Sequence, residues 1–187
     1  MIIGLTGRNG AGKGTVAEWL QARGLRYTSL SDELRADLRR RGLQPTRDNL
    51  IAGGRRLREE GGPGVLAQLV LQRIAEEADG GPGAIVDSVR NPAEVEVLRT
   101  NPGFRLLEVR AERRTRYERI RARNRAGDAA SFEEFVRQEE AELNSSDVAA
   151  QRLVATAAMA DLAIDNDDAP EALEAALATL FPELAGE

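Results

Sequence analysis

A single lysine stands in this chain of 187 residues, and all its other basic residues are arginine. It lies at position 13, within a glycine-rich segment. In a phosphate-binding loop, backbone N–H groups surround the phosphate oxygens and a lysine reaches the β- and γ-phosphates as a compact ammonium on a thin stem, a role that a planar guanidinium does not fit. The segment therefore predicts a nucleotide-binding loop with a catalytic Lys13, formed by Gly7, Arg8, Asn9, Gly10, Ala11, Gly12, Lys13, Gly14 and Thr15.

The segments on either side of this loop agree with that interpretation. Residues 2–6 form a short apolar run, typical of a buried parallel strand, and residues 13–22 have the apolar spacing of a helix. The loop would then end at a helix N-terminus, where unpaired N–H groups and the positive end of the helix dipole attract an anion. The alternative, an incidental lysine in a glycine turn, is disfavoured by the spacing, the flanks and the single lysine together.

One position departs from the usual pattern of such loops. The residue after the lysine is ordinarily a serine or threonine that binds magnesium, and here it is Gly14, with the hydroxyl one position later at Thr15. The form GxxxxGKGT resembles the nucleoside monophosphate kinases, of which adenylate kinase is the familiar member. That resemblance implies ATP and Mg²⁺ as cofactors, a metal held largely through water and a distant aspartate, and a threonine that touches a nucleotide phosphate.

Composition narrows the chemistry further. The chain has no cysteine and no histidine, which excludes a disulfide framework, a zinc site of the usual ligands and catalysis by either residue. No run approaches the length of a membrane span, and no charged leader precedes the first strand, so we expect a cytoplasmic protein without membrane partners. The net charge of −5 argues against nucleic acid as a main partner.

Strand-like runs alternate with helical patterns along the chain, which is typical of a three-layer α/β/α fold. We expect one P-loop NTPase domain over residues 1–187, with a five-stranded parallel sheet. The expected strands are residues 2–6, 26–30, 84–87, 104–109 and 161–165. The expected helices are residues 31–42, 47–60, 63–79, 92–99, 112–126, 131–158 with a break near 144, and 170–180.

Two connections are longer than a parallel crossover requires. Residues 31–83 separate the second and third expected strands, and residues 110–159 separate the fourth and fifth. We expect the first to form a helical acceptor-binding insertion and the second to form a lid that closes over the nucleotides.

Asp87 ends an apolar strand, at the sheet edge where open α/β folds place their ligands. We expect it to bind magnesium, directly or through water, together with Thr15. An aspartate that only caps a turn is the alternative. Arg90 follows three residues later, and the family resemblance implies that it touches the transferring or accepting phosphate, so we also assign it as catalytic. A surface ion pair with Glu94 is the alternative for Arg90.

Residues 31–35, Ser-Asp-Glu-Leu-Arg, resemble the adenylate kinase segment that begins the monophosphate-binding helices. The resemblance implies that Arg35 holds the acceptor phosphate, with Asp32 beside it. The same stretch is also an N-capped amphipathic helix with Ser31 as the cap, and the two interpretations are compatible. We assign the acceptor site to Asp32, Arg35, Arg58 and Arg90.

Eight arginines lie between residues 110 and 125. At helical spacing Arg116, Arg119 and Arg123 share one face, and like charges on one face repel unless an anion arrives between them. At this place in the chain the resembling kinases carry lid arginines that clamp the donor phosphates, so we assign Arg119 and Arg123 as catalytic. The alternatives are a solvated face balanced by the glutamates of residues 133–142 and a nucleic-acid patch.

The resemblance extends over nearly the whole chain. Residues 45–50, 57–60 and 62–64 resemble a largely uncharacterised group of archaeal and bacterial proteins described as dephospho-CoA-kinase-like or adenylate-kinase-like. We therefore expect small-molecule nucleotide substrates and a monomer or homodimer.

The acceptor itself stays open. A monophosphate presents an anionic oxygen and needs no base, whereas dephospho-CoA kinases and nucleoside kinases attack with a hydroxyl and need a carboxylate such as Asp32. Arg35, Arg90 and the arginines of residues 55–58 favour the monophosphate. A slowly hydrolysing nucleotide switch is the third possibility, and Gly14 disfavours it because switch proteins use a hydroxyl there on magnesium.

Overall fold

The computed structural model describes residues 1–77, 81–123, 129, 131–144 and 148–184. Its strands form one parallel sheet in the order β2-β3-β1-β4-β5. The strands are β1 Ile2–Thr6, β2 Arg26–Ser29, β3 Ala84–Asp87, β4 Phe104–Arg110 and β5 Leu162–Asp165. The five predicted strands and the α/β class are therefore confirmed. Because β1 is the central strand, the glycine-rich loop that follows it leaves the middle of the sheet's carboxyl edge.

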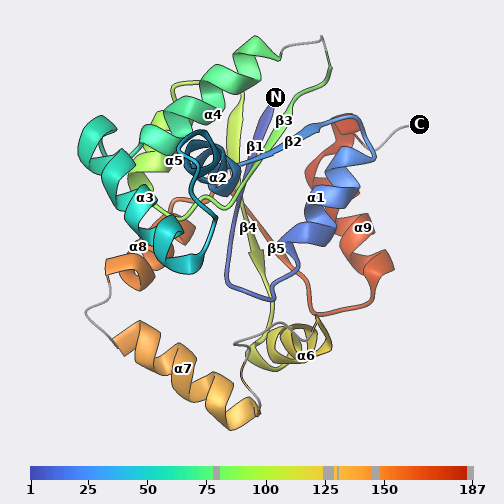
Figure 1. The fold of residues 1–187 in the computed structure, drawn as a ribbon. Helices are drawn as coiled ribbons and strands as arrows, with labels where there is room; N and C mark the ends of the chain where they lie inside the picture. The colour runs from blue at the N-terminus through green and yellow to red at the C-terminus, as the bar shows by residue number, and fades with distance from the viewer. Residues whose placement is uncertain (78–80, 124–128, 130, 145–147, 185–187) are drawn as a thin grey trace.

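Helices cover both faces of the sheet, as Figure 1 shows. The helices are α1 Lys13–Gln21, α2 Leu30–Arg40, α3 Arg47–Gly61, α4 Val65–Glu76, α5 Pro92–Leu98, α6 Arg113–Arg123, α7 Phe132–Asn144, α8 Val148–Ala157 and α9 Pro170–Leu180, followed by a short 3₁₀ turn, Pro182–Leu184. Helices α1 and α9 pack on one face, and α4 and α5 pack on the other. None of the helices in the described ranges has the length and apolar character needed to cross a bilayer.

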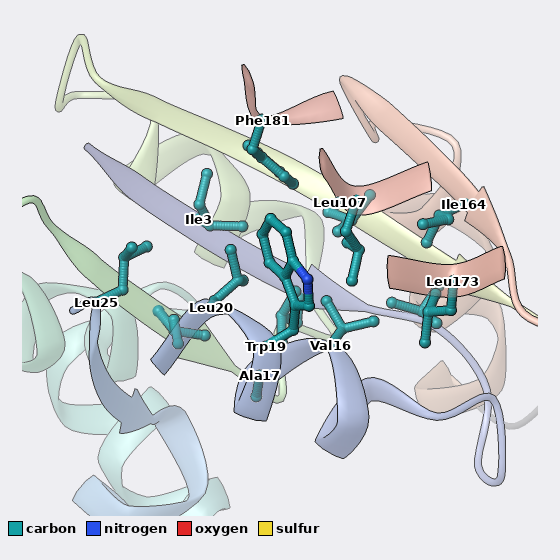
Figure 2. Packing of buried hydrophobic residues seen from close by; sticks show 14 of the residues in the cluster. Ile3, Val16, Ala17, Trp19, Leu20, Leu25, Leu107, Ile164, Leu173 and Phe181 are labelled. Carbon is teal, nitrogen blue, oxygen red and sulfur yellow. The ribbon is translucent and has the colours of Figure 1, made fainter. Parts of the chain in front are cut away.

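The core consists of two apolar clusters, one on each face of the sheet. Side chains alternate across β1, so Ile3 contributes to the cluster under α1 and α9, and Ile2 contributes to the cluster under α4 and α5. Figure 2 shows Trp19 of α1 in the middle of the first cluster, with Phe181 close to its ring. A sheet buried on both faces holds the loops at its carboxyl edge on a rigid base.

Some helix ends differ from the prediction. The cap of α2 is Ser29, whose Oγ accepts a hydrogen bond from the N–H of Ser31 at 3.2 Å, so the helix begins before Ser31 instead of after it. The helix predicted to begin at Pro63 begins at Val65, because the chain is still turning at Gly62, where φ is 85°. The break predicted near residue 144 is confirmed by the end of α7 at Asn144.

Candidate functional site

The glycine-rich loop lies close against the ends of β4 and β5. Gly7 and Gly12 have φ of 132° and 96°, a range that favours glycine. A Cβ at Gly7 would lie 2.2 Å from the carbonyl oxygen of Val109, and a Cβ at Gly12 would lie 2.0 Å from Nδ2 of Asn166. Both positions therefore require glycine for two reasons, the backbone angle and the lack of space. The loop leads directly into the N-terminus of α1, as the sequence predicts.

Lys13 folds back over this loop. Its Nζ donates hydrogen bonds to the carbonyl oxygens of Gly7 at 2.8 Å and Arg8 at 3.1 Å. The pKa of Lys13 is lowered to about 8, chiefly by burial; the charges of Arg90 and Arg123 act in the same direction, and the charge of Asp87 opposes them. The groups around this ammonium are thus the arginines and the aspartate that the sequence placed in the site.

The lowered pKa of Lys13 predicts proton uptake when a nucleotide binds. Phosphate oxygens favour the charged ammonium, so the pKa should rise on binding and the protein should take up a fraction of a proton near pH 8. The unfolded chain, with a pKa near 10.5, holds this proton between about pH 8 and about 10.5, so the contribution of Lys13 to the free energy of unfolding increases with pH across that window.

Two measurements check this expectation. Because the chain has one lysine, the NMR signal of its Nζ can be titrated without overlap, with an expected midpoint of about 8. Calorimetry of ATP binding in buffers of different ionisation enthalpy measures the proton uptake. A midpoint near the ordinary 10.5, unchanged by ATP, would contradict the predicted environment of Lys13.

Asp87 closes β3 and has two hydrogen-bond donors. The hydroxyl of Tyr27 donates to its Oδ2 at 2.9 Å, and the N–H of Ser88 donates to its Oδ1 at 2.6 Å. Burial raises the pKa of Tyr27, and the carboxylate of Asp87 adds to this, so the hydroxyl remains a donor at neutral pH. The sequence prediction missed Tyr27, because an aromatic residue in a strand indicates only strand propensity.

The oxygen ligands available for magnesium are the carboxylate of Asp87 and the exposed hydroxyl of Thr15. Within the described ranges no group of three or more acidic, cysteine or histidine side chains surrounds a possible metal position. Magnesium prefers oxygen ligands and is commonly shared between one or two protein groups, water and nucleotide phosphates. These residues fit an ion of that kind. A Cβ on Gly14 would meet nothing within 4 Å, so a hydroxyl residue would have room there.

Two arginines of α6, a helix that follows β4, form hydrogen bonds with the glycine-rich loop. Arg119 donates to the carbonyl oxygen of Ala11 and to Oδ1 of Asn166, each at 3.4 Å. Arg123 donates to Oδ1 of Asn9 at 3.0 Å. Asn166, after β5, donates from Nδ2 to the same oxygen of Ala11 at 2.9 Å. The structure thus brings Arg119 and Arg123 onto the glycine-rich loop. It also places Asn166, which follows β5, at the same loop.

Arg116 differs from its predicted neighbours. It is buried, with 4% of its surface exposed, and both of its terminal nitrogens pair with Glu139 of α7. Glu139 also pairs with Arg113 at 3.0 Å and with Arg8 of the phosphate loop at 3.2 Å. Burial acts to raise the pKa of Glu139, but the guanidinium groups of Arg116 and Arg8 outweigh it and hold the pKa below its usual range. Arg116 is therefore balanced by a glutamate, as in the alternative interpretation, but it is buried and does not lie on a solvated face.

The predicted acceptor residues lie in two groups. Arg35 and Asp32 pair with each other at 2.9 Å on the exposed surface of α2. Arg58 of α3 pairs at 3.3 Å with Glu94, a carboxylate with only 2% of its surface exposed and a pKa raised by burial. Glu94 accepts the backbone N–H of Arg90 at 3.1 Å and forms no ion pair with that guanidinium in the described ranges. The side chain of Arg90 is exposed, and its positive charge lowers the pKa of Lys13.

A cavity of about 450 Å³ lies between α2, α3 and α8. It combines arginines with aliphatic side chains and is lined by Leu34, Leu50, Ile51, Gly54, Arg55, Arg58, Glu59 and Arg152. Arg152 comes from residues 110–159 and the others come from residues 31–83, so the two long connections meet here. The sequence prediction did not include Arg152, although it is the only charged residue of α8.

The sequence is similar to one protein-family model and to several archaeal proteins. A family model described as an AAA domain matches residues 6–136. A UPF0200 protein of Methanothermobacter thermautotrophicus is 38% identical over 144 residues, which cover 76% of this chain and 72% of the relative. A UPF0200 protein of Hyperthermus butylicus is 34% identical over 187 residues, which cover 100% of this chain and 96% of the relative.

Among solved structures, the crystal structure of shikimate kinase from Bacteroides thetaiotaomicron has a TM-score of 0.60. The two sequences are 15% identical, and the alignment covers 97% of this chain and 98% of the kinase. At that identity the likeness shows the fold alone. The fold is that of P-loop kinases, as the sequence predicts.

Proposed function

The chain belongs to the UPF0200 family and, over residues 6–136, to the AAA domain family, and we propose that it is an ATP-dependent phosphotransferase. Its acceptor is a nucleoside or deoxynucleoside monophosphate, and the products are ADP and a nucleoside diphosphate. The bond between the γ-phosphorus and the β,γ-bridging oxygen breaks, and a bond to an anionic oxygen of the acceptor forms. No proton has to be removed, so the site needs positioning and charge neutralisation more than it needs a base.

The residues around the phosphate loop support the donor half of this proposal. Lys13, Arg119 and Arg123 come from α1 and α6 and gather at the loop carbonyls and at Asn9. In this assignment the backbone N–H groups of the loop bind the donor phosphates, and the cations neutralise the charge of the transferring group. Asp87 and Thr15 would hold magnesium, which would supply further charge neutralisation.

The cavity between α2, α3 and α8 is the observation that carries the acceptor assignment. Its arginines suit an anionic group, and its leucine and isoleucine side chains suit the flat apolar face of a base. A volume of about 450 Å³ lies in the range of small-molecule sites. In this proposal residues 31–83 bind the acceptor, and residues 110–159 form the lid that supplies Arg152 and excludes water.

A hydroxyl acceptor is the second candidate function, and one observation favours it. About half of the Asp32 side chain is exposed, so an incoming hydroxyl can reach it. Its pairing with Arg35 at 2.9 Å argues the other way, because the guanidinium already occupies a carboxylate oxygen that would have to accept the proton of the hydroxyl.

Gly54 gives a direct test of the cavity. It is a glycine inside α3, where alanine would be more stable by about 1 kcal/mol, so its presence calls for a reason. A Cβ there would lie 3.1 Å from Nη1 of Arg58 and 3.6 Å from Cδ2 of Leu34. We expect Gly54→Leu to fill the cavity, raise the KM of the monophosphate by about tenfold or more, and leave the KM of ATP unchanged.

Ala52→Leu is the matched control, because it adds the same side chain to an exposed position of the same helix. Thermal unfolding of both variants checks the fold, and Gly54→Ala offers a smaller change that the helix favours. Equal acceptor KM values in the Gly54 variants, the control and the wild type would remove the acceptor from this cavity.

A further inference from the structure

Tyr27 holds an unusual position for an aromatic side chain. It lies on β2, an edge strand, with 42% of its surface exposed, so it contributes little to the core. Its hydroxyl nevertheless makes a specific hydrogen bond to Oδ2 of Asp87 at 2.9 Å. The two residues are 60 positions apart in the chain, and the parallel pairing of β2 with β3 brings them together.

The pairing of β2 with β3 does not depend on the hydrogen bond between Tyr27 and Asp87. The backbone ladder already pairs β2 with β3 from Arg26↔Ala84 to Ser29↔Asp87. An exposed side-chain hydrogen bond adds little to stability. The main consequence of the bond is therefore on the orientation of the Asp87 carboxylate.

That orientation is fixed from both sides. Oδ1 accepts the N–H of Ser88 at 2.6 Å while Oδ2 accepts the hydroxyl of Tyr27, so rotation of the carboxylate would break both bonds. Each oxygen keeps a further lone pair for another partner. Ser88 has φ of 67°, a left-handed conformation that is rare outside glycine and that often marks functional sites.

Asp87 and Lys13 are neighbours that bind different partners. Asp87 is close enough to raise the pKa of Lys13, yet the described residues include no ion pair between the two. Lys13 instead donates to the carbonyl oxygens of Gly7 and Arg8. A carboxylate free to turn toward the ammonium would neutralise it, and neither group would then be available to a phosphate or a cation.

We propose that Tyr27 is a positioning residue, whose hydroxyl fixes the Asp87 carboxylate for a divalent cation shared with the phosphates of the donor. This inference rests on the proposed phosphotransferase function, in which Asp87 is the acidic ligand. Side chains that orient a metal ligand in this way commonly change metal affinity or activity by about 10- to 100-fold when removed.

Binding of Mn²⁺ to the protein in the presence of ADP, followed by water-proton relaxation, tests the proposal without turnover. We expect Tyr27→Phe to weaken Mn²⁺ binding about tenfold or more and Asp87→Ala to weaken it at least as much. The double variant should bind no more weakly than Asp87→Ala, because Tyr27 acts only through Asp87. Thr28→Val, which removes a hydroxyl from the opposite face of the same strand, should bind like the wild type.

Wild-type Mn²⁺ binding by Tyr27→Phe would overturn the proposal, as would full additivity in the double variant. Unchanged binding by Asp87→Ala would overturn it as well, by removing Asp87 from the cation site. If every metal-binding result is as expected but the wild type transfers no phosphoryl group, the proposed function fails and the cation site stands.

Discussion

Replacement of Lys13 by alanine should lower phosphoryl transfer by about 10² to 10³ or more, with the domain still folded. The ammonium lies over the phosphate loop, on carbonyl oxygens of Gly7 and Arg8, and contributes little to the apolar core. Its positive charge stabilises the negative charge on the transferring phosphoryl group in the transition state. Steady-state kinetics with ATP and the acceptor, together with thermal unfolding, measures both parts of the expectation.

Lys13→Arg is the informative companion variant. It keeps the charge, but a planar guanidinium is larger than the ammonium that fits between the two carbonyl oxygens. We expect it to be nearly as inactive as Lys13→Ala. Near-normal turnover in Lys13→Ala would contradict the phosphate-loop mechanism, and full activity of Lys13→Arg would contradict the explanation for the single lysine.

The variants Arg35→Ala and Asp32→Asn distinguish a monophosphate acceptor from a hydroxyl acceptor. If the acceptor is a monophosphate, Arg35→Ala should weaken acceptor binding and transfer strongly, because an anionic phosphate loses a charged hydrogen-bond donor. Asp32→Asn should then be mild, since no proton has to be removed. If the acceptor is a hydroxyl, loss of the base should cost roughly 10² to 10⁴ in turnover. We expect Arg35→Ala to be the more damaging change.

Both residues lie on the surface of α2, so the comparison is not confused by unfolding. Their ion pair at 2.9 Å is exposed, and exposed pairs contribute only about 0–1 kcal/mol to stability. Values of kcat and KM for both substrates are measured for each variant. An inactive Asp32→Asn that still binds both substrates normally would replace the monophosphate kinase with a kinase of hydroxyl acceptors.

The sequence predicted the sheet well because its signals are local. Most of the strands are short apolar runs, and several helices have clear end signals, such as Pro92 and Pro170 in first turns. The glycine-rich loop between β1 and α1 was predictable from its spacing, its flanks and its single lysine together. The relationship that is shown is to the UPF0200 and AAA domain families, with a fold like that of P-loop kinases, and the finer resemblance to dephospho-CoA-kinase-like proteins stays a prediction.

The contacts that the sequence did not predict join residues distant in the chain. Tyr27 reaches Asp87 only because β2 and β3 are neighbours, and Glu139 reaches Arg8 across 131 positions because α7 lies against the loop region. A pattern read along the chain shows neither strand order nor helix placement. For the same reason it could place Arg116 on a charged face without showing that this side chain is buried against a glutamate.

A phosphoryl-transfer screen tests the central claim most directly. The wild-type protein is incubated with Mg²⁺ and ATP labelled at the γ-phosphate, and each ribonucleoside monophosphate, each deoxynucleoside monophosphate and dephospho-CoA is offered in turn. We expect label to appear in a nucleoside diphosphate for one or a few of the monophosphates, and no label to appear in coenzyme A. Labelled coenzyme A without any labelled diphosphate, or release of inorganic phosphate alone with every acceptor, would contradict a nucleoside monophosphate kinase.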